Sequence, residues 1–306
     1  MGTPDFAVPS LEMLVKEKYD VTAVITQKDK PKGRGYKVCA PPVKVFAIDN
    51  GIRVLQPDKV NDRVFIQELT QYNAELFITV AYGKILSKEF LDIPNRGCIN
   101  VHASLLPKYR GASPIHSAII NGDTKTGITT MLTDVGMDTG DILLKEEVPI
   151  SENATAGELH DILSKTGAKV LKRTLEEIES GRLKRKRQND AEASYAPRIK
   201  KESGLIDWNK SAKQIHDLVR GTNPWPGAYT FYEGNRMRIW KTRKIKGDNT
   251  GQKPGTIIDI SQKEMIVSSG SSSIAILEIQ FDSCKKMSVG DYNCGHCINR
   301  GEVLGK

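Results

Sequence analysis

The 306-residue sequence has no long hydrophobic run and no apolar leader at its start. A membrane-spanning helix needs ~20 consecutive apolar residues, and no stretch comes close to that length. A secretory signal would show a basic segment followed by an apolar core, and the first residues do not have this pattern. We therefore expect a cytoplasmic protein that does not enter a membrane.

Cysteine is also scarce, with five residues in the chain. Such a small, odd set does not suggest a disulfide framework, so we expect reduced thiols. Cys284, Cys294, His296 and Cys297 do offer four soft ligands within a short span, which is compatible with a zinc site. Because the single Cys-x-x-Cys lacks a second well-spaced pair, we expect no metal.

Acidic residues are fewer than basic ones. Lysine and arginine number 45 against 37 aspartates and glutamates, which gives a formal net charge of +8. A basic balance suits a polyanionic partner such as a nucleic acid, although many proteins are mildly basic without one.

A change of composition divides the chain. The basic run at residues 182–187 and the polar residues 188–194 have no apolar periodicity, which is typical of a linker. A chain of this length is also comfortable for two hydrophobic cores. We therefore predict a first domain over residues 1–181, a linker over 182–203 and a second domain over 204–306.

Strand-like and helix-like segments alternate through the first domain. Apolar stretches at 21–26, 76–80 and 98–102 are typical of buried strands, while 60–72 has the period of an amphipathic helix. This alternation favours βαβ crossovers and a Rossmann-like, doubly wound, mainly parallel α/β sheet. A long helix is predicted from residue 156 to about 180, opened by Thr155 with Glu158 three residues on.

The second domain differs in character. A helix over 211–220 is followed by a rigid corner at 223–227 and then by about five short strands with turn signals between them. That pattern favours a small OB-like β-barrel, a fold often used to hold nucleic acid. Arg236 and Arg238 belong to a strongly basic hairpin within it.

Asn100 and His102 carry the clearest chemical signal. They are two residues apart on a strand, so both side chains project from one face near its carboxyl end. In a parallel α/β sheet this end opens into the crevice that holds ligands. A structural role is the alternative for each, because a strand histidine is often a satisfied core residue and Asn100 could fix a loop.

Two loops carry further charged groups. Residues 134–141, between strands predicted at 127–133 and 142–148, contain three acids and two glycines. Asp138 would have a chemical use beside the end of the 98–102 strand, although the loop could simply be a well-formed turn. Residues 27–37 form a lysine-rich loop that we predict to be irregular, either a solvated surface loop or a binding element.

Several motifs follow one another along nearly the whole chain. They are residues 2–6 (Gly-Thr-Pro-Asp-Phe), 30–37 with its Gly-Arg-Gly, 80–83 (Val-Ala-Tyr-Gly), 100–107 (Asn-Val-His-Ala-Ser-Leu-Leu-Pro) with Arg110-Gly111, 134–141, and 223–226 (Asn-Pro-Trp-Pro). Their order resembles that of the methionyl-tRNA formyltransferase family. The Asn-x-His-x-Ser-Leu-Leu-Pro element with a downstream Asp is shared by the wider group of enzymes that use 10-formyltetrahydrofolate.

The resemblance implies transfer of a formyl group from 10-formyltetrahydrofolate to the α-amino group of methionine on initiator tRNA, and we expect a monomer. An enzyme that formylates an amino sugar nucleotide or another small amine is the alternative, but it would have no need for the basic loop. A non-catalytic RNA-binding protein would leave Asn100, His102 and Asp138 unexplained.

The resemblance also assigns roles to residues. It implies catalysis by Asn100, His102 and Asp138. It implies folate binding by Ser104, Leu105, Leu106, Pro107, Tyr82, Gly83, Asp134 and Asp141. It implies tRNA binding by the basic residues Lys30, Lys32, Arg34, Lys37, Arg185, Arg187, Arg236 and Arg238.

The chemistry of formyl transfer agrees with these roles. Attack by an amine gives a tetrahedral intermediate whose oxygen becomes negative, so donors must already point at it. Asn100 can donate from its amide and His102 from a ring nitrogen, while Asp138 would orient the imidazole. An α-amine has a pKa of ~7.7–8.0, so a strong base matters less than a placed oxyanion site.

One departure concerns the start of the chain. Family members have a strand before the Gly-Thr-Pro-Asp-Phe motif, placed centrally in the doubly wound sheet, whereas only Met1 precedes it here. Loss of a central strand would leave backbone groups unpaired, at roughly 1–3 kcal/mol for each buried group. We therefore expect this chain to be shorter at its N-terminus than the active protein.

Overall fold

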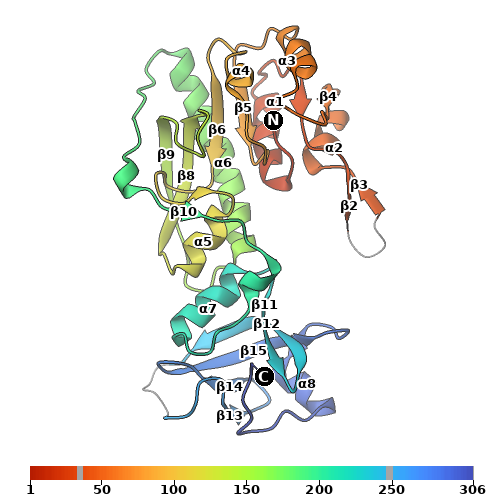
Figure 1. Cartoon of the computed structure of the whole chain (residues 1–306), viewed down its shortest axis with the longest axis vertical. Coiled ribbons are helices and arrows are strands. Elements are labelled where there is room, and N and C mark those ends of the chain that lie inside the picture. The colour runs from red at the N-terminus through yellow and green to blue at the C-terminus, as the bar shows by residue number, and fades with distance from the viewer. Residues whose placement is uncertain (33–36, 246–250, 306) are drawn as a thin grey trace. The chain divides into compact units, whose positions relative to one another are not determined.

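The computed structural model describes residues 1–306 except 33–36, 246–250 and 306 (Figure 1). The chain divides into two compact units. The first comprises Met1–Pro114, Lys125–Pro149 and His160–Pro197, and the second comprises Ile115–Thr124, Ile150–Leu159 and Arg198–Lys306. The domain limits expected from the sequence stay a prediction, although residues 182–197 pack within the first unit.

Two sheets form the centre of the first unit. In one, β1 (Val24–Ile25) pairs in parallel with β4 (Val54–Leu55). In the other the order is β5-β6-β8-β9, built from β5 (Phe77–Val80), β6 (Cys98–His102), β8 (Lys125–Leu132) and β9 (Ile142–Pro149). Helices pack beside these strands (Figure 1). They are η1 (Asp5–Ala7), α1 (Val8–Lys16), α2 (Pro42–Asp49), α3 (Arg63–Thr70), α4 (Lys88–Leu91) and most of α6 (Ala156–Glu179), whereas α5 (Pro114–Ile120) belongs almost wholly to the second unit.

The prediction of a mainly parallel sheet is only partly confirmed. The β1–β4 and β5–β6 pairs are parallel, but β8 runs antiparallel to both β6 and β9. Parallel neighbours need a crossover of a dozen or more residues, whereas a short loop makes a hairpin. The loop between β8 and β9 has no helix, so these two strands form a hairpin.

The predicted start of the long helix is confirmed. The Thr155 amide donates to Glu158 Oε2 at 2.8 Å, and the Glu158 amide donates to Thr155 Oγ1 at 3.2 Å. These reciprocal bonds satisfy two amides that the first helical turn would leave without partners. In the described part of the chain, no helix is both long and apolar enough to cross a membrane.

The lysine-rich segment differs from the prediction of an irregular loop. Its arms form an antiparallel hairpin of β2 (Lys30–Lys32) and β3 (Lys37–Cys39), with Lys32 opposite Lys37. Arg34 lies outside the described residues.

The predicted linker is partly ordered into short elements. These are η2 (Asp190–Glu192), β10 (Tyr195–Ala196) and η3 (Lys201–Gly204). Strand β10 pairs in parallel with β7 (Arg110–Gly111), which follows β6 in the first unit. Part of the segment is therefore a strand partner rather than a solvated connection.

The second unit is an antiparallel sheet with helices. Its main order is β11-β12-β15-β14-β13, and β16 pairs with β15. The elements are α7 (Ala212–Gly221), β11 (Ala228–Tyr232), β12 (Asn235–Lys244), β13 (Ile257–Ile260), β14 (Met265–Ser268), β15 (Ser273–Phe281), β16 (Met287–Ser288) and α8 (Val289–Gly295). Fully buried Ile215, Met237 and Ile276 belong to its core. Among the described residues, β11 and β13 do not pair, so a closed barrel is not confirmed.

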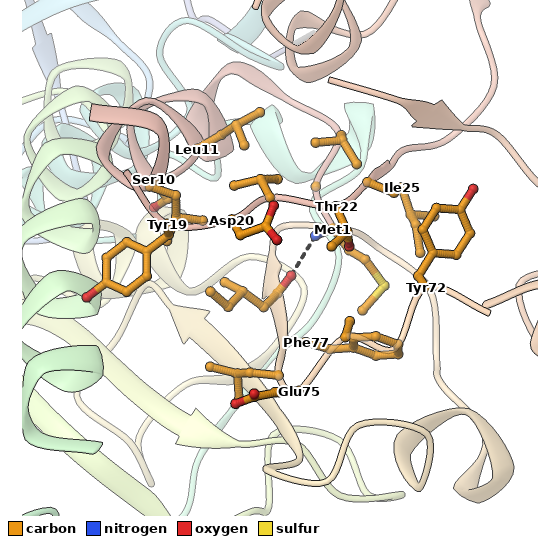
Figure 2. Close-up of a pocket in the computed structure, with 18 of the residues that line it drawn as sticks. Met1, Ser10, Leu11, Tyr19, Asp20, Thr22, Ile25, Tyr72, Glu75 and Phe77 are labelled. Atoms are coloured by element: carbon orange, nitrogen blue, oxygen red, sulfur yellow. Dashed lines mark hydrogen bonds between the residues drawn. The ribbon is translucent and has the colours of Figure 1, made fainter. Parts of the chain in front are cut away.

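A cavity of about 420 Å³ separates the two sheets of the first unit (Figure 2). Residues of β1 and β5 line two of its sides, and Met1 and Gly2 lie at one end. The Gly2 amide donates to Ile25 O at 3.1 Å, and the Val80 amide donates to Met1 O at 2.9 Å. Met1 and Gly2 therefore bridge β1 and β5 as a strand would. The first strand that the family resemblance implies stays a prediction.

The amine of Met1 makes the start of the chain sensitive to pH. It is buried and donates to Ile78 O, and burial lowers the pKa of this amine from 8.0 to about 6. Because the unfolded chain then binds more protons than the folded one between pH 6 and 8, stability should rise over this window. The rise should be about 2–3 kcal/mol in the free energy of unfolding.

We expect an N-terminal extension of about five apolar, β-branched residues to raise Tm and to abolish this pH dependence. The extension replaces the charged amine with an amide and places side chains in the cavity. A glycine-serine extension of equal length is the matched control, because it removes the amine but fills no space. Thermal unfolding at pH 6 and pH 8 is the measurement. Equal Tm values for the two extensions would show that apolar side chains do not fill the cavity.

Candidate active site

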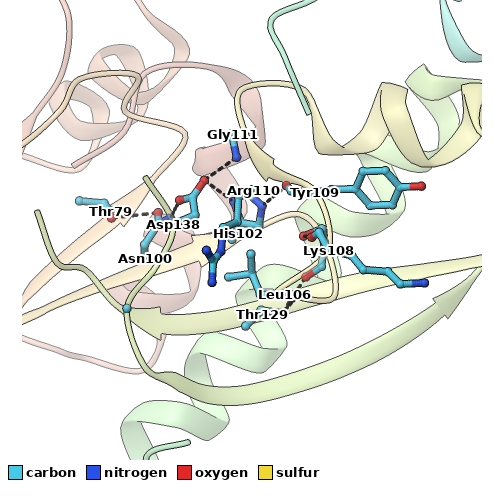
Figure 3. Close-up of polar contacts among 12 residues, drawn as sticks. Thr79, Asn100, His102, Leu106, Lys108, Tyr109, Arg110, Gly111, Thr129 and Asp138 are labelled. Atoms are coloured by element: carbon cyan, nitrogen blue, oxygen red, sulfur yellow. Dashed lines mark hydrogen bonds and ion pairs between the residues drawn. The ribbon is translucent and has the colours of Figure 1, made fainter. Parts of the chain in front are cut away.

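Asn100 projects from β6 toward the loop that joins β8 and β9 (Figure 3). Its Oδ1 accepts a hydrogen bond from Thr79 Oγ1 at 2.9 Å, and Thr79 is its register partner on β5. Its Nδ2 donates to Asp138 Oδ1 at 3.4 Å. These two contacts fix which way the amide faces, and the second hydrogen on Nδ2 can serve a substrate oxygen.

His102 lies one pleat further along β6, and its side chain is only 7% exposed. Its Nε2 lies 2.9 Å from Tyr109 O. A carbonyl oxygen can only accept, so Nε2 carries a hydrogen. Nδ1 lies 3.6 Å from Asp138 Oδ2, which is a charge contact rather than a hydrogen bond. Nδ1 is therefore the nitrogen whose proton can change during a reaction.

Asp138 is the third residue of the site, beside Asn100 and His102. Its Oδ2 accepts from the Gly111 amide at 2.8 Å, and its side chain is 16% exposed. Gly111 has a φ of +115°, and a Cβ there would come within 2.8 Å of Ala196 O. Glycine is therefore required at this position, and it lets the backbone approach the carboxylate closely. The structure thus brings together the three residues that the sequence placed in catalysis.

The Ser104–Pro107 loop is held in place by two residues of the sheet, Thr129 and Lys145. Thr129 Oγ1 donates to Ser104 O at 2.7 Å and accepts from the Leu106 amide at 3.1 Å. Lys145 Nζ donates to Leu106 O. The pKa of this amine is lowered, mainly because the group is partly buried and to a smaller extent because the Lys186 charge is nearby. The Leu106 side chain is fully buried with Met131 and Ile142. The loop is thus preformed, and Leu106 is fully buried within it.

Other residues predicted to bind folate have local roles in the structure. Tyr82 is buried in the core with Phe77 and Leu86, and this burial raises the pKa of its hydroxyl to about 12. Asp134 folds its own loop by accepting from the Gly136 amide at 3.0 Å and from Thr139 Oγ1 at 2.6 Å. Two further positions show backbone features only. Gly83 is exposed with a φ of +74°, and Asp141 O accepts from the Leu132 amide.

The described residues among those predicted to bind tRNA make local contacts within their own units. Lys30 Nζ donates to Gln27 Oε1 at 2.6 Å, and Arg185 and Arg187 are exposed. In the second unit, Arg236 and Arg238 share the Asp282 carboxylate at 3.0 and 3.5 Å. Within the described ranges, no group of three or more His, Cys, Asp or Glu side chains is placed to hold a metal ion.

Four participants were missed from the sequence. Thr79 is a polar residue in an otherwise apolar strand, which was a usable signal. Tyr109 and Gly111 act through backbone atoms, and only the Arg-Gly motif pointed near them. Gln188 donates to Asp138 O from a segment with no periodic pattern, so no feature of the sequence pointed to it.

Comparisons with known proteins point to one family. A family model described as formyl transferase matches residues 1–175, and one described as formyl transferase, C-terminal domain, matches residues 198–297. The methionyl-tRNA formyltransferase of Acetivibrio thermocellus is 55% identical over all of this chain and 98% of its own length. That of Ruminiclostridium cellulolyticum is 57% identical over the same shares. The chain belongs to the methionyl-tRNA formyltransferase family.

Solved structures of formyltransferases share the fold. A sugar 3N-formyl transferase, solved with dTDP and 5-N-formyl-THF, has a TM-score of 0.69 at 23% identity over 93% of this chain and 97% of its own. The methionyl-tRNA formyltransferase from Clostridium thermocellum has a TM-score of 0.56 at 16% identity over 92% and 96%.

We expect Asp138→Asn to lower kcat for formyl transfer by roughly 10²-fold, because His102 Nδ1 would lose the charge that faces it. The amide is nearly isosteric but has one acceptor oxygen in place of two, so it keeps either the Asn100 or the Gly111 hydrogen bond and a small fall in Tm is expected. Asp92→Asn is the control, since Asp92 is exposed and pairs only with Lys88 among the described ion pairs. An Asp138→Asn enzyme as active as the control would contradict the role of the carboxylate.

Proposed function

We propose that this protein transfers the formyl group of 10-formyltetrahydrofolate to the α-amino group of methionine on initiator tRNA, and so supports translation initiation. The observation that carries the proposal is the meeting of Asn100, His102 and Asp138 in a chain that matches methionyl-tRNA formyltransferases over its whole length. Likeness to sugar formyltransferases is distant in sequence and supports a common fold only.

The residues around the group fit a folate co-substrate. Val135 and Met137 precede Asp138 on its loop and are 64% and 57% exposed. Large apolar side chains exposed beside a polar site suit a flat, partly apolar ring system. The Ser104–Pro107 loop and the 134–141 loop would hold this co-substrate, which supplies the formyl group. No metal is needed for such a transfer.

In this proposal the chain provides donors and a proton path. Asn100 Nδ2 can give its second hydrogen to the oxygen that gains negative charge, and His102 Nδ1 can donate to the same oxygen once it carries a proton. His102 Nδ1, beside Asp138, can take the proton that leaves the amine. The Nε2 contact to Tyr109 keeps the ring in one orientation throughout.

We further propose that basic elements guide the tRNA. These are the β2–β3 hairpin with the neighbouring Arg34, the exposed Arg185 and Arg187, and the Arg236–Arg238 strand of the second unit. An OB-like role for the sheet of that unit, a monomeric state and a cytoplasmic location belong to the same proposal.

The direct test incubates the protein with labelled 10-formyltetrahydrofolate and charged initiator tRNA. We expect label on the methionine, and a His102→Ala variant should lose turnover while it still binds tRNA. Label that passes only to an amino sugar nucleotide or another small amine would overturn the assignment.

The basic hairpin has its own prediction. Arg34→Ala should raise KM for tRNA and reduce the salt dependence of binding by about one phosphate contact, with kcat at saturating tRNA nearly unchanged. Arg63→Ala is a suitable control, because Arg63 is exposed on α3. Identical tRNA kinetics in wild type and Arg34→Ala would refute the role of the hairpin.

A further inference from the structure

The side-chain amide of Gln188 donates two hydrogen bonds and accepts two, all within the first unit. Its Nε2 donates to Asp138 O and to Gly140 O, both at 2.8 Å. Its Oε1 accepts from Arg110 Nε at 3.1 Å and from Nη2 at 2.9 Å. A guanidinium can only donate and a carbonyl can only accept, so the amide has one possible orientation. Only 7% of Gln188 is exposed.

Arg110 holds Gln188 from the other side. Its side chain is 3% exposed, and its Nη2 also reaches Asp190 Oδ1 at 2.7 Å. A buried charge is costly unless it is paired and hydrogen-bonded, so this guanidinium strongly favours an acceptor at position 188. Arg110 follows Tyr109 directly and precedes Gly111, which are the two residues whose backbones contact His102 and Asp138.

The backbone of Asp138 needs such support. Its φ is +55°, a left-handed conformation that is unfavourable for a residue with a side chain. Strained conformations of this kind persist only where the surroundings impose them. The Gln188 amide contacts the carbonyls on both sides of Thr139, so it fixes the turn from which the carboxylate projects.

The same segment also fixes the opposite side of His102. The Tyr109 amide donates to Ser194 Oγ at 2.9 Å, and the Arg110 amide donates to Ser194 O at 2.8 Å. Tyr109 O is the acceptor for His102 Nε2. Residues 188–196, which we name the clamp segment, therefore hold both groups that orient the imidazole.

We propose that Gln188, held by Arg110, is a positioning residue that keeps Asp138 against His102 and thereby sets the rate of formyl transfer. Gln188 acts through Asp138 and does not contact substrate. This inference rests on the proposed catalytic function of Asp138, and it assigns part of the apparent linker to the active site.

Gln188→Glu is the most selective variant. The carboxylate has the same shape and still accepts from Arg110, but it has no hydrogen for Asp138 O and Gly140 O. We expect kcat to fall roughly 10- to 100-fold, with KM for folate and for tRNA within about twofold of wild type. Gln188→Met, of similar size, is the second variant if Gln188→Glu lowers Tm strongly. Asn189→Ala is the control from the same segment, because Asn189 bonds to Ala191 and Glu192 instead.

The decisive measurement is the Asp138→Asn, Gln188→Glu double variant of the full chain. If Gln188 acts through Asp138, the double variant should be no slower than Asp138→Asn alone. A kcat of the double variant that falls by the product of the two single losses would overturn the positioning role while the proposed function stands. Wild-type kcat in both Gln188 variants would do the same. Wild-type kcat in Asp138→Asn would instead overturn the proposed role of Asp138 itself.

Discussion

The Asp138 carboxylate is contacted from three directions, by the Asn100 amide, the His102 ring and the Gly111 backbone. Each of these groups has another partner that fixes it: Thr79 for Asn100, Tyr109 for His102 and the β7–β10 pair for Gly111. A donor placed before the reaction begins costs nothing to reorganise when charge develops. Orienting one carboxylate therefore requires β5, β6, β7 and β10 to meet around it.

The antiparallel course of β8 sets the geometric problem that the loop must solve. Leu132 at the end of β8 lies opposite Ile99, so the loop to β9 leaves near the start of β6. His102 is three residues further along, roughly 10 Å away at the rise of a strand. Residues 133–141 must fold back over that distance to deliver Asp138. The left-handed φ of Asp138 and the Gln188 contacts are consequences of this return path.

Much of the site could be predicted because its signals are local. The two-residue spacing of Asn100 and His102 and the acidic loop with Asp138 are visible in the sequence, as is the cap of α6 at Thr155. Tyr82 shows the limit of motif reading, since its ring is buried in the core although its neighbours form a loop. Gln188 shows another limit, because a buried amide 50 residues from its partner has no local pattern. The antiparallel direction of β8 was not predicted for a similar reason, because pairing direction depends on where a distant strand docks.

Charge on the second unit illustrates why counting basic residues is a weak guide to binding strength. Arg236 and Arg238 share Asp282, and Arg243 pairs with Glu264 at 2.7 Å. Exposed ion pairs contribute only about 0–1 kcal/mol each, so they hardly restrain these side chains. A phosphate that replaces Asp282 as the partner would therefore lose little from the broken pair, and release of counterions from the nucleic acid would favour the exchange.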